Sequence, residues 1–202
     1  MRSRIFRSCL VAVFSALLCA CADGSAAPAA VHATSTAAPT VWTTLEQRPL
    51  QIPHLAPGAP CPAAKPHAAL PGIGLGIGDG PAYPIHGTVD GVLHYTLPQN
   101  LDGEYWGTVW GAMKVIWAVD TPYYPDVVLV RGRQLDGPNE VRFDPGPMPP
   151  TELRILPYPE STPEGWTGQA SFTRVRAPGC YGYQVDGTTF SRVIIFAARP
   201  ES

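Results

Sequence analysis

The sequence predicts an antiparallel all-β sandwich over residues 41–202, and three observations support this fold class. Glycine and proline are frequent, with 20 and 24 residues in a chain of 202, so long helices are interrupted. The apolar runs between them are short and rich in β-branched residues. Turn sequences such as Pro145-Gly146-Pro147 and Asp186-Gly187 separate most of the runs. The length after residue 41 suits a single domain with one core.

The chain begins with a segment that predicts export. Arg2, Arg4 and Arg7 precede an apolar run over 9–18 that is too short to span a bilayer. The run ends in Leu18-Cys19-Ala20-Cys21, which resembles the bacterial lipobox. That resemblance implies a lipoprotein signal peptide over 1–20, lipidation of Cys21, and a membrane anchor outside the cytoplasm.

Two segments separate this signal from the predicted sandwich. Residues 21–40 are mostly Ala, Pro, Ser and Thr, so they lack the apolar side chains of a core, and we expect a flexible tether. Residues 41–60 regain apolar residues but also contain four prolines, which indicates an extended strap lying on the domain. A short helical turn is expected at 43–47.

Nine strands are expected in the remainder of the chain, most of them separated by turn residues. They cover residues 92–97, 107–110, 113–119, 127–131, 141–143, 153–156, 171–176, 181–185 and 192–197. The apolar spacing over 106–117 also fits a helix, but Gly107, Gly111 and the alternation around Trp117 favour a strand.

The cysteines predict one disulfide bond. Of the five, Cys9 and Cys19 leave with the signal and Cys21 takes the lipid, so Cys61 and Cys180 remain. A pair in an oxidising compartment is most simply a disulfide; the alternative is two separate buried thiols.

The C-terminal half resembles an immunoglobulin-like sandwich. In Gly179-Cys-Tyr-Gly-Tyr-Gln-Val-Asp-Gly187 a cysteine enters a strand that is followed by a tight turn, as at strands F and G. The resemblance implies that Trp117 is the core tryptophan of strand C, packed against the disulfide. The two cysteines lie farther apart than in that family, and Cys61 follows the strap rather than occupying an obvious strand B.

Over residues 41–202 the chain is also similar to uncharacterised lipoproteins of environmental bacteria. The similarity rests on segments such as Leu129-Val-Arg-Gly-Arg-Gln-Leu-Asp-Gly137 and Val193-Ile-Ile-Phe196. It implies a location at the cell envelope and a fold, but it implies no activity.

Charge excludes one class of partner. Without the three arginines of the signal, eleven Lys and Arg oppose sixteen Asp and Glu, so nucleic acid is not an expected partner. We expect a monomer that is held on the membrane by its lipid.

The sequence contains only incomplete patterns for catalytic, metal-binding or cofactor-binding sites. His86, Asp90 and His94 have a spacing that would align metal ligands on a helix, but the glycines between them indicate a turn between strands. The glycine run 72–81 lacks the features of a phosphate-binding loop and predicts a flexible or close-packed loop. The sequence contains no Gly-x-Ser-x-Gly motif. We therefore predict no metal site and no cofactor.

Aromatic residues supply the remaining candidate site. Alternation along strands turns some of them outward, where they would suit a protein, peptide or glycan partner; the alternative is a thick core. Two arginines on one face of a strand would pair with an anionic ligand or with Asp136 and Glu140. The candidate binding residues are Trp106, Trp110, Tyr123, Tyr124, Trp166, Arg131 and Arg133.

The sequence therefore predicts a lipid-anchored envelope protein with a non-catalytic binding or structural role. The alternative is a metal-dependent or hydrolytic envelope enzyme that uses His86, Asp90 and His94.

Overall fold

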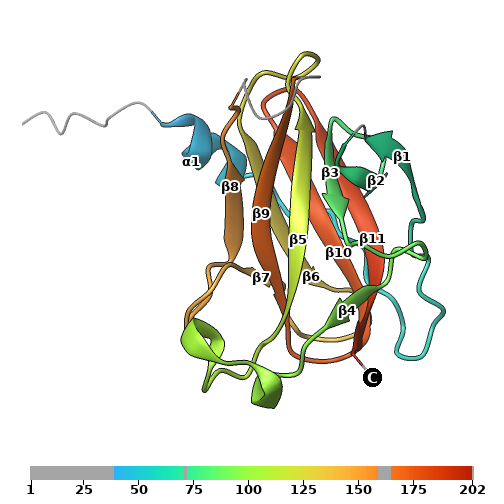
Figure 1. Cartoon of the computed structure of the whole chain (residues 1–202). Helices are drawn as coiled ribbons and strands as arrows, with labels where there is room; N and C mark the ends of the chain where they lie inside the picture. Colours follow the sequence, from blue (N-terminus) through green and yellow to red (C-terminus); the bar gives the residue numbers. More distant parts are fainter. Residues whose placement is uncertain (1–38, 71, 159–164, 202) are drawn as a thin grey trace, which may run out of the picture. The chain divides into compact units, whose positions relative to one another are not determined.

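A computed structural model describes residues 39–70, 72–158 and 165–201, which form a β-sandwich with one short helix (Figure 1). The signal peptide, Cys21 and the tether up to residue 38 lie outside the described residues. The elements are α1 (Val41–Glu46), β1 (Pro66–Leu70), β2 (Gly74–Ile77), β3 (Ala82–Ile85), β4 (Leu93–Tyr95), η1 (Pro98–Asn100), η2 (Gly103–Tyr105), β5 (Gly111–Asp120), β6 (Val128–Gln134), β7 (Arg142–Phe143), β8 (Glu152–Ile155), β9 (Trp166–Val175), β10 (Gly179–Gly187) and β11 (Ser191–Pro200).

The sandwich consists of a five-stranded sheet packed on a four-stranded sheet. The larger sheet has the order β4-β11-β10-β6-β8 and the smaller one the order β3-β5-β9-β7. These orders correspond to the GFC and ABED sheets of an immunoglobulin-like sandwich, although β7 precedes β8 along the chain. All pairs are antiparallel except β4 with β11, which run parallel. The predicted all-β sandwich is thus confirmed, with one parallel pair that was not expected.

The core between the sheets is aromatic. Trp117 from β5 lies edge-on to Tyr183 from β10, with ring centroids 5.1 Å apart, and Tyr183 stacks on Phe196 at 4.3 Å. All three side chains are fully buried. Burying side chains of this size provides much of the apolar stabilisation of a sandwich.

Trp117 does not have the position that the resemblance implied. It belongs to β5, which occupies the place of strand B, and it packs on Tyr183 rather than on the disulfide. Cys61 and Cys180 instead belong to a separate apolar cluster with Ile52 and Leu135. The disulfide therefore lies outside the main core.

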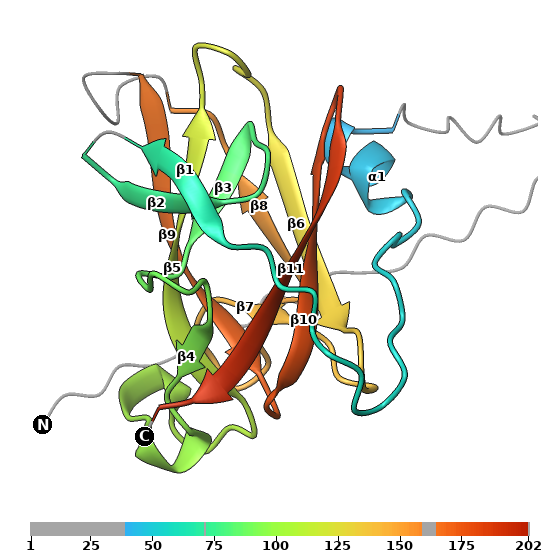
Figure 2. The same cartoon turned by 90° about the vertical axis from the view of Figure 1, so that its right-hand side faces the viewer.

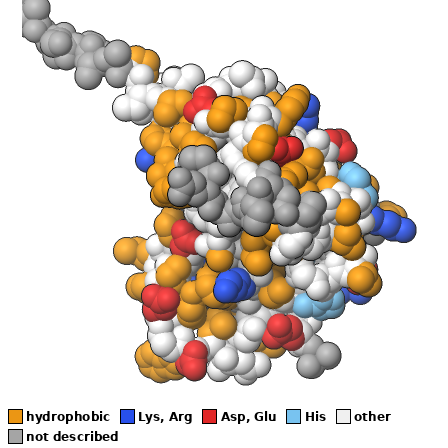
Figure 3. Space-filling model, turned by 45° about the horizontal axis from the view of Figure 1, so that its top comes forward, with side chains coloured by type: hydrophobic (Ala, Val, Ile, Leu, Met, Phe, Trp, Pro, Cys, Tyr) orange, Lys and Arg blue, Asp and Glu red, His pale blue; other side chains and the backbone are white. Residues whose placement is uncertain are grey.

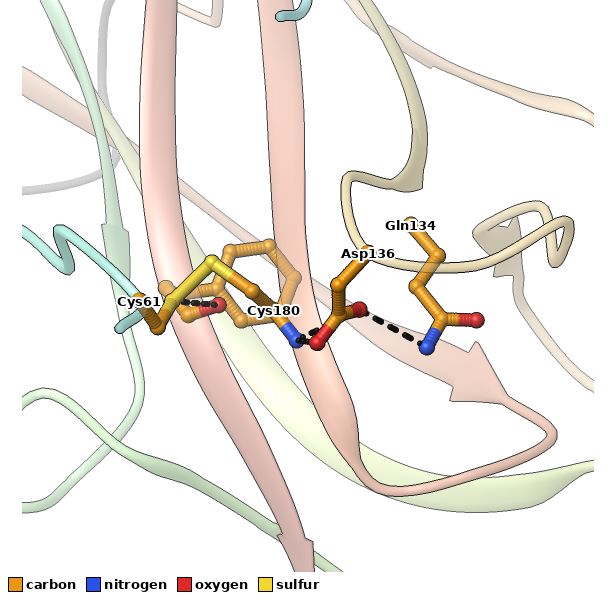
Figure 4. The surroundings of a disulfide bond; sticks show 5 residues. Cys61, Gln134, Asp136 and Cys180 are labelled. Carbon is orange, nitrogen blue, oxygen red and sulfur yellow. Dashed lines mark hydrogen bonds between the residues drawn. A yellow bond between two sulfur atoms is a disulfide. The ribbon is translucent and has the colours of Figure 1, made fainter. Parts of the chain in front are cut away.

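The strap, residues 41–60, begins with α1 and then crosses the outer face of the larger sheet. Leu55 N donates to Leu135 O and Ala64 N donates to Ile195 O, so each end of the crossing is bonded to this sheet. The disulfide Cys61–Cys180 then joins the strap to β10 (Figure 4). Asp136 accepts hydrogen bonds from Cys180 N at 3.1 Å, which fixes the backbone at that cysteine.

Strands β1 and β2 form a separate hairpin that crosses the smaller sheet near β3 (Figure 2). Leu70 from β1 packs with Ile85 and Ala118 on the outer side of that sheet. A Cβ at Gly76 would lie 2.8 Å from the Cβ of Tyr83, so the close approach of β2 to β3 requires glycine there. The prediction of a loop over 72–81 is thus wrong, because part of the glycine run is a strand that packs closely.

Two further predicted elements differ from the structure. Residues 107–110 form a loop, since Gly107 has a positive φ of 72° that ends the extended backbone. The hairpin after β10 is confirmed, but its turn is Thr188-Thr189, closed by a hydrogen bond from Gly187 N to Phe190 O.

The helical turn predicted at 43–47 is observed as α1, with the Thr40 side chain capping its N-terminus. No helix within the described ranges is long and apolar enough to cross a membrane.

Candidate functional site

The three candidate metal ligands do not gather into a site. His86 is fully buried, its Nδ1 bonds to Gly91 O at 2.9 Å, and its ring lies 5.2 Å from that of Phe196. Burial lowers the pKa of His86 to about 4, so the imidazole is neutral near pH 7. Asp90 instead closes its own turn, because its Oδ1 accepts a hydrogen bond from Val92 N. In the part of the chain that the structure describes, no three His, Cys, Asp or Glu side chains are placed to hold a metal ion.

The candidate aromatic residues do not form one surface. Trp106 is 76 % exposed and Tyr123 is 79 % exposed, but Trp106 precedes β5 and Tyr123 follows it. Ten residues of strand span about 30 Å, so these two side chains cannot share a small ligand. Trp110 and Tyr124 are buried and do not belong to an exposed strip. Trp166 is half-buried, with its ring 5.9 Å from that of Tyr83.

Trp110 is covered by arginine side chains. The guanidinium of Arg176 lies 4.1 Å from its ring centroid and that of Arg142 lies 5.7 Å away, which are cation–π distances. The neighbouring Arg174 is fully buried and donates to Trp110 O and to Asp144 O. These arginines hold the loops at this end of the sandwich, so Trp110 has a structural role.

The two arginines of β6 donate hydrogen bonds to backbone carbonyls of the strap. Arg131 donates to Glu46 O at 3.0 Å and forms an ion pair with Asp186 at 2.8 Å. Arg133 donates to Ile52 O and bonds to His54 Nε2. The expected partners, Asp136 and Glu140, are not used. Arg131 and Arg133 therefore fasten residues 46–54 to the sheet.

One open groove does contain a predicted residue in an exposed position. It lies where the β2–β3 turn, the β5–β6 loop and the β10–β11 turn meet, at the upper end of the sandwich in Figure 1. We call it the tyrosine groove. Its volume is about 650 Å³, which is in the range of small-molecule sites. It is lined by Asp79, Gly80, Pro81, Tyr83, Asp120, Tyr123, Tyr124, Thr189, Phe190 and Arg192.

Packed aromatic side chains form one wall of the tyrosine groove. The ring of Tyr124 lies edge-on to that of Phe190 at 4.9 Å, and its hydroxyl accepts a hydrogen bond from Thr188 N at 2.7 Å. A Cβ at Gly187 would lie 2.6 Å from the Tyr124 hydroxyl, so glycine permits this contact. The β5–β6 loop and the β10–β11 turn are thereby joined into one rigid wall.

Another part of the lining is built on Tyr83. A Cβ at Gly80 would lie 2.1 Å from the Tyr83 hydroxyl, so the phenol fits directly over the glycine. Burial, together with the negative charges of Asp120 and Asp79, raises the pKa of Tyr83. The phenol therefore keeps its proton and is a hydrogen-bond donor at neutral pH.

Tyr123 also lines the groove, and its side chain is largely exposed. Its backbone N–H donates to Asp120 O at 3.2 Å and to Asp120 Oδ1 at 3.3 Å, which fixes the loop while the side chain stays exposed. Asp79 and Arg192 are also accessible to solvent. Figure 3 turns this end of the sandwich forward and shows hydrophobic side chains interspersed with acidic and basic ones. The groove thus offers aromatic faces, carboxylate acceptors, and phenol and guanidinium donors.

Only part of this site follows from the amino-acid sequence. The pair Tyr123 and Tyr124 was a candidate, and the hairpin after β10 was predicted. Tyr83, Phe190 and Arg192 were missed because they belong to two other segments of the chain. The sequence around Gly80-Pro81 marks a turn, but it does not indicate which loops that turn faces.

No protein-family model, no curated protein and no solved structure matches the chain.

Proposed function

We propose that this chain is a lipoprotein of the bacterial cell envelope, anchored through lipid on Cys21, that binds a ligand in the tyrosine groove without transforming it. It would belong with the bacterial lipoproteins that its sequence resembles. As proposed, the protein acts as a monomer outside the cytoplasm and does not bind nucleic acid.

The groove is the observation that carries the binding role. Tyr123 presents a large, exposed aromatic side chain on the lining of this groove, where a ligand can pack against it. The side chains around it are already held in place by Gly80, Gly187 and the Tyr124–Phe190 contact. Such preorganisation lowers the entropy cost of binding.

The disulfide supports the proposed location. Disulfides form and persist in oxidising compartments, and Cys61–Cys180 joins positions 119 residues apart. A protein that depends on this bond to hold its strap would fold poorly in a reducing cytoplasm.

The anchor can be tested by labelling cells with a clickable fatty acid. The full-length chain is expected to take up the label and the Cys21→Ala variant to remain unlabelled. Equal labelling of both proteins would refute the anchor.

The binding role can be tested by photo-crosslinking in the same cells. A benzoylphenylalanine at position 123 is expected to yield a cross-linked product, and the same residue at position 106 provides the matched control. Trp106 is equally exposed but lies at the other end of β5. Equal yields at the two positions, or none at 123, would show that the groove is not a binding site.

A further inference from the structure

We infer that the ligand of the tyrosine groove is a glycan built of pyranose rings. This inference rests on the proposed function, because it names the ligand class for the same groove. It is carried by the match between the groups of the groove and the chemistry of a sugar.

The aromatic part of the groove matches the apolar faces of a pyranose. A pyranose with mostly equatorial hydroxyls presents C–H groups on both faces of its ring, and these pack on the electron-rich face of an aromatic side chain. Tyr123 is exposed for such a contact, and Tyr83 also lines the groove. Tyr83 belongs to β3 and Tyr123 to the β5–β6 loop, so two separate elements each supply an aromatic ring to the groove.

The polar part matches sugar hydroxyls, which both donate and accept hydrogen bonds. Asp79 and Asp120 supply carboxylate acceptors, whereas the Tyr83 phenol and the Arg192 guanidinium supply donors. A neutral polyol satisfies both kinds of group at once. None of these side chains would be left without a partner when the ligand displaces water.

Two other ligand classes fit less well. A proline-rich peptide also packs on aromatic grooves, but its prolines lack backbone N–H donors, so it offers the carboxylates of Asp79 and Asp120 fewer hydrogen bonds than a polyol does. An anionic ligand would meet two carboxylates and one arginine, so repulsion would outweigh attraction. The groups of the groove therefore favour an uncharged, hydroxyl-rich ligand.

The inference can be tested with the full-length protein in detergent micelles on an array of defined ligands. The array carries chitotetraose, cellotetraose, maltotetraose, mannotetraose, isolated peptidoglycan fragments and a decaproline peptide. Retention on peptidoglycan fragments alone would indicate a ligand from the envelope, and retention on cellotetraose or mannotetraose would indicate one from outside the cell. We expect retention on at least one saccharide and none on decaproline.

Three variants connect retention to the groove. Tyr123→Ala and Arg192→Ala alter exposed side chains, so neither removes core packing, and we expect affinity for the retained saccharide to fall at least tenfold. Trp106→Ala removes an equally exposed aromatic side chain at the other end of β5 and is expected to leave affinity within twofold of wild type. Mass spectrometry should return the oligosaccharide at full length, whereas cleavage products would overturn the non-catalytic role.

The outcomes separate the inference from the proposed function. No retention on any saccharide, preferential retention on decaproline, or unchanged affinity of Tyr123→Ala would overturn the glycan inference. A cross-link from position 123 to a protein would also overturn it, while the binding role of the groove would stand. If position 123 gives no cross-link in cells, the proposed function fails as well.

Discussion

Acid should destabilise this sandwich through the single residue His86. The side chain is fully buried against Phe196 and Tyr183, and burial lowers its pKa from the ordinary 6.5 to about 4. Above pH 6.5 the imidazole is neutral in both the folded and the unfolded chain. Between pH 6.5 and 4 the unfolded chain binds a proton that the folded chain rejects, so the free energy of unfolding falls as the pH falls.

The size of this effect follows from the two pKa values. Between the two pKa values, each pH unit lowers the free energy of unfolding by about 1.4 kcal/mol. Above pH 6.5 the free energy hardly changes, so the total loss between pH 7.5 and pH 4.5 is about 2.5 kcal/mol. That is a large share of the 5–15 kcal/mol stability of a typical domain. Below pH 4 both states are protonated and the contribution of His86 no longer changes.

Urea unfolding of the full-length chain, followed by tryptophan fluorescence from pH 7.5 to 4.5, measures this contribution. The control is His86→Asn, whose carboxamide provides a donor near the position of Nδ1 but does not titrate. We expect the wild type to lose about 2.5 kcal/mol more than the variant over this range. Parallel curves for the two proteins would refute the assignment, as would an NMR titration of His86 with a midpoint near 6.5.

Three further predictions concern the strap. Replacing Cys61 and Cys180 by alanine should lower the free energy of unfolding by about 4 to 5 kcal/mol, because a loop of this length is no longer closed in the unfolded chain. Replacing the buried Asp186 by asparagine should cost about 3 kcal/mol in urea unfolding, since Arg131 loses its ion pair. A Cβ at Gly182 would lie 2.9 Å from Ile52 Cγ2, so Gly182→Ala should loosen the strap and increase amide exchange at residues 51–55.

The substitutions at Asp186 and Gly182 each have a matched control. Replacing the exposed Glu140, which pairs with Arg142, by glutamine should change stability by less than about 1 kcal/mol. Gly168→Ala adds a methyl group where no atom lies within 4 Å, and it should leave exchange in the strap unchanged. If Asp186→Asn were no more costly than Glu140→Gln, or Gly182→Ala no more disruptive than Gly168→Ala, the described role of the strap contacts would be wrong. Unchanged stability after loss of both cysteines would show that the strap is held without the disulfide.

The strands of the sandwich could be predicted where local sequence and tertiary structure agree. Short runs of apolar, β-branched and aromatic residues between turns mark β5, β6, β10 and β11, and the cysteine count indicates the disulfide. The strands β1 to β3 could not be predicted, because their sequence is mostly Gly, Pro and Ala. Their extended backbone depends on contacts such as that of Gly76 with Tyr83, which belong to the folded chain alone.

In the candidate site, too, some features follow from local sequence and others depend on how distant segments meet in the folded chain. The exposed position of Tyr123 follows from a turn sequence, but the groove needs loops that start at residues 78, 121 and 188. Alternation correctly placed Arg131 and Arg133 on one side of β6. It did not predict that backbone carbonyls of the strap would occupy their donors, because that depends on how the strap crosses the sheet.

The disulfide determines how tension would pass through an anchored molecule. With Cys21 held in a membrane, a pull on the sandwich would first reach α1 and the strap, which are held by hydrogen bonds and ion pairs that can detach one by one. At Cys61 the pull would meet a covalent bond to β10, which is paired on both sides by β11 and β6. The strap would thus lengthen under load by about twenty residues and then stop, so the groove would keep its shape while the domain moved farther from the membrane.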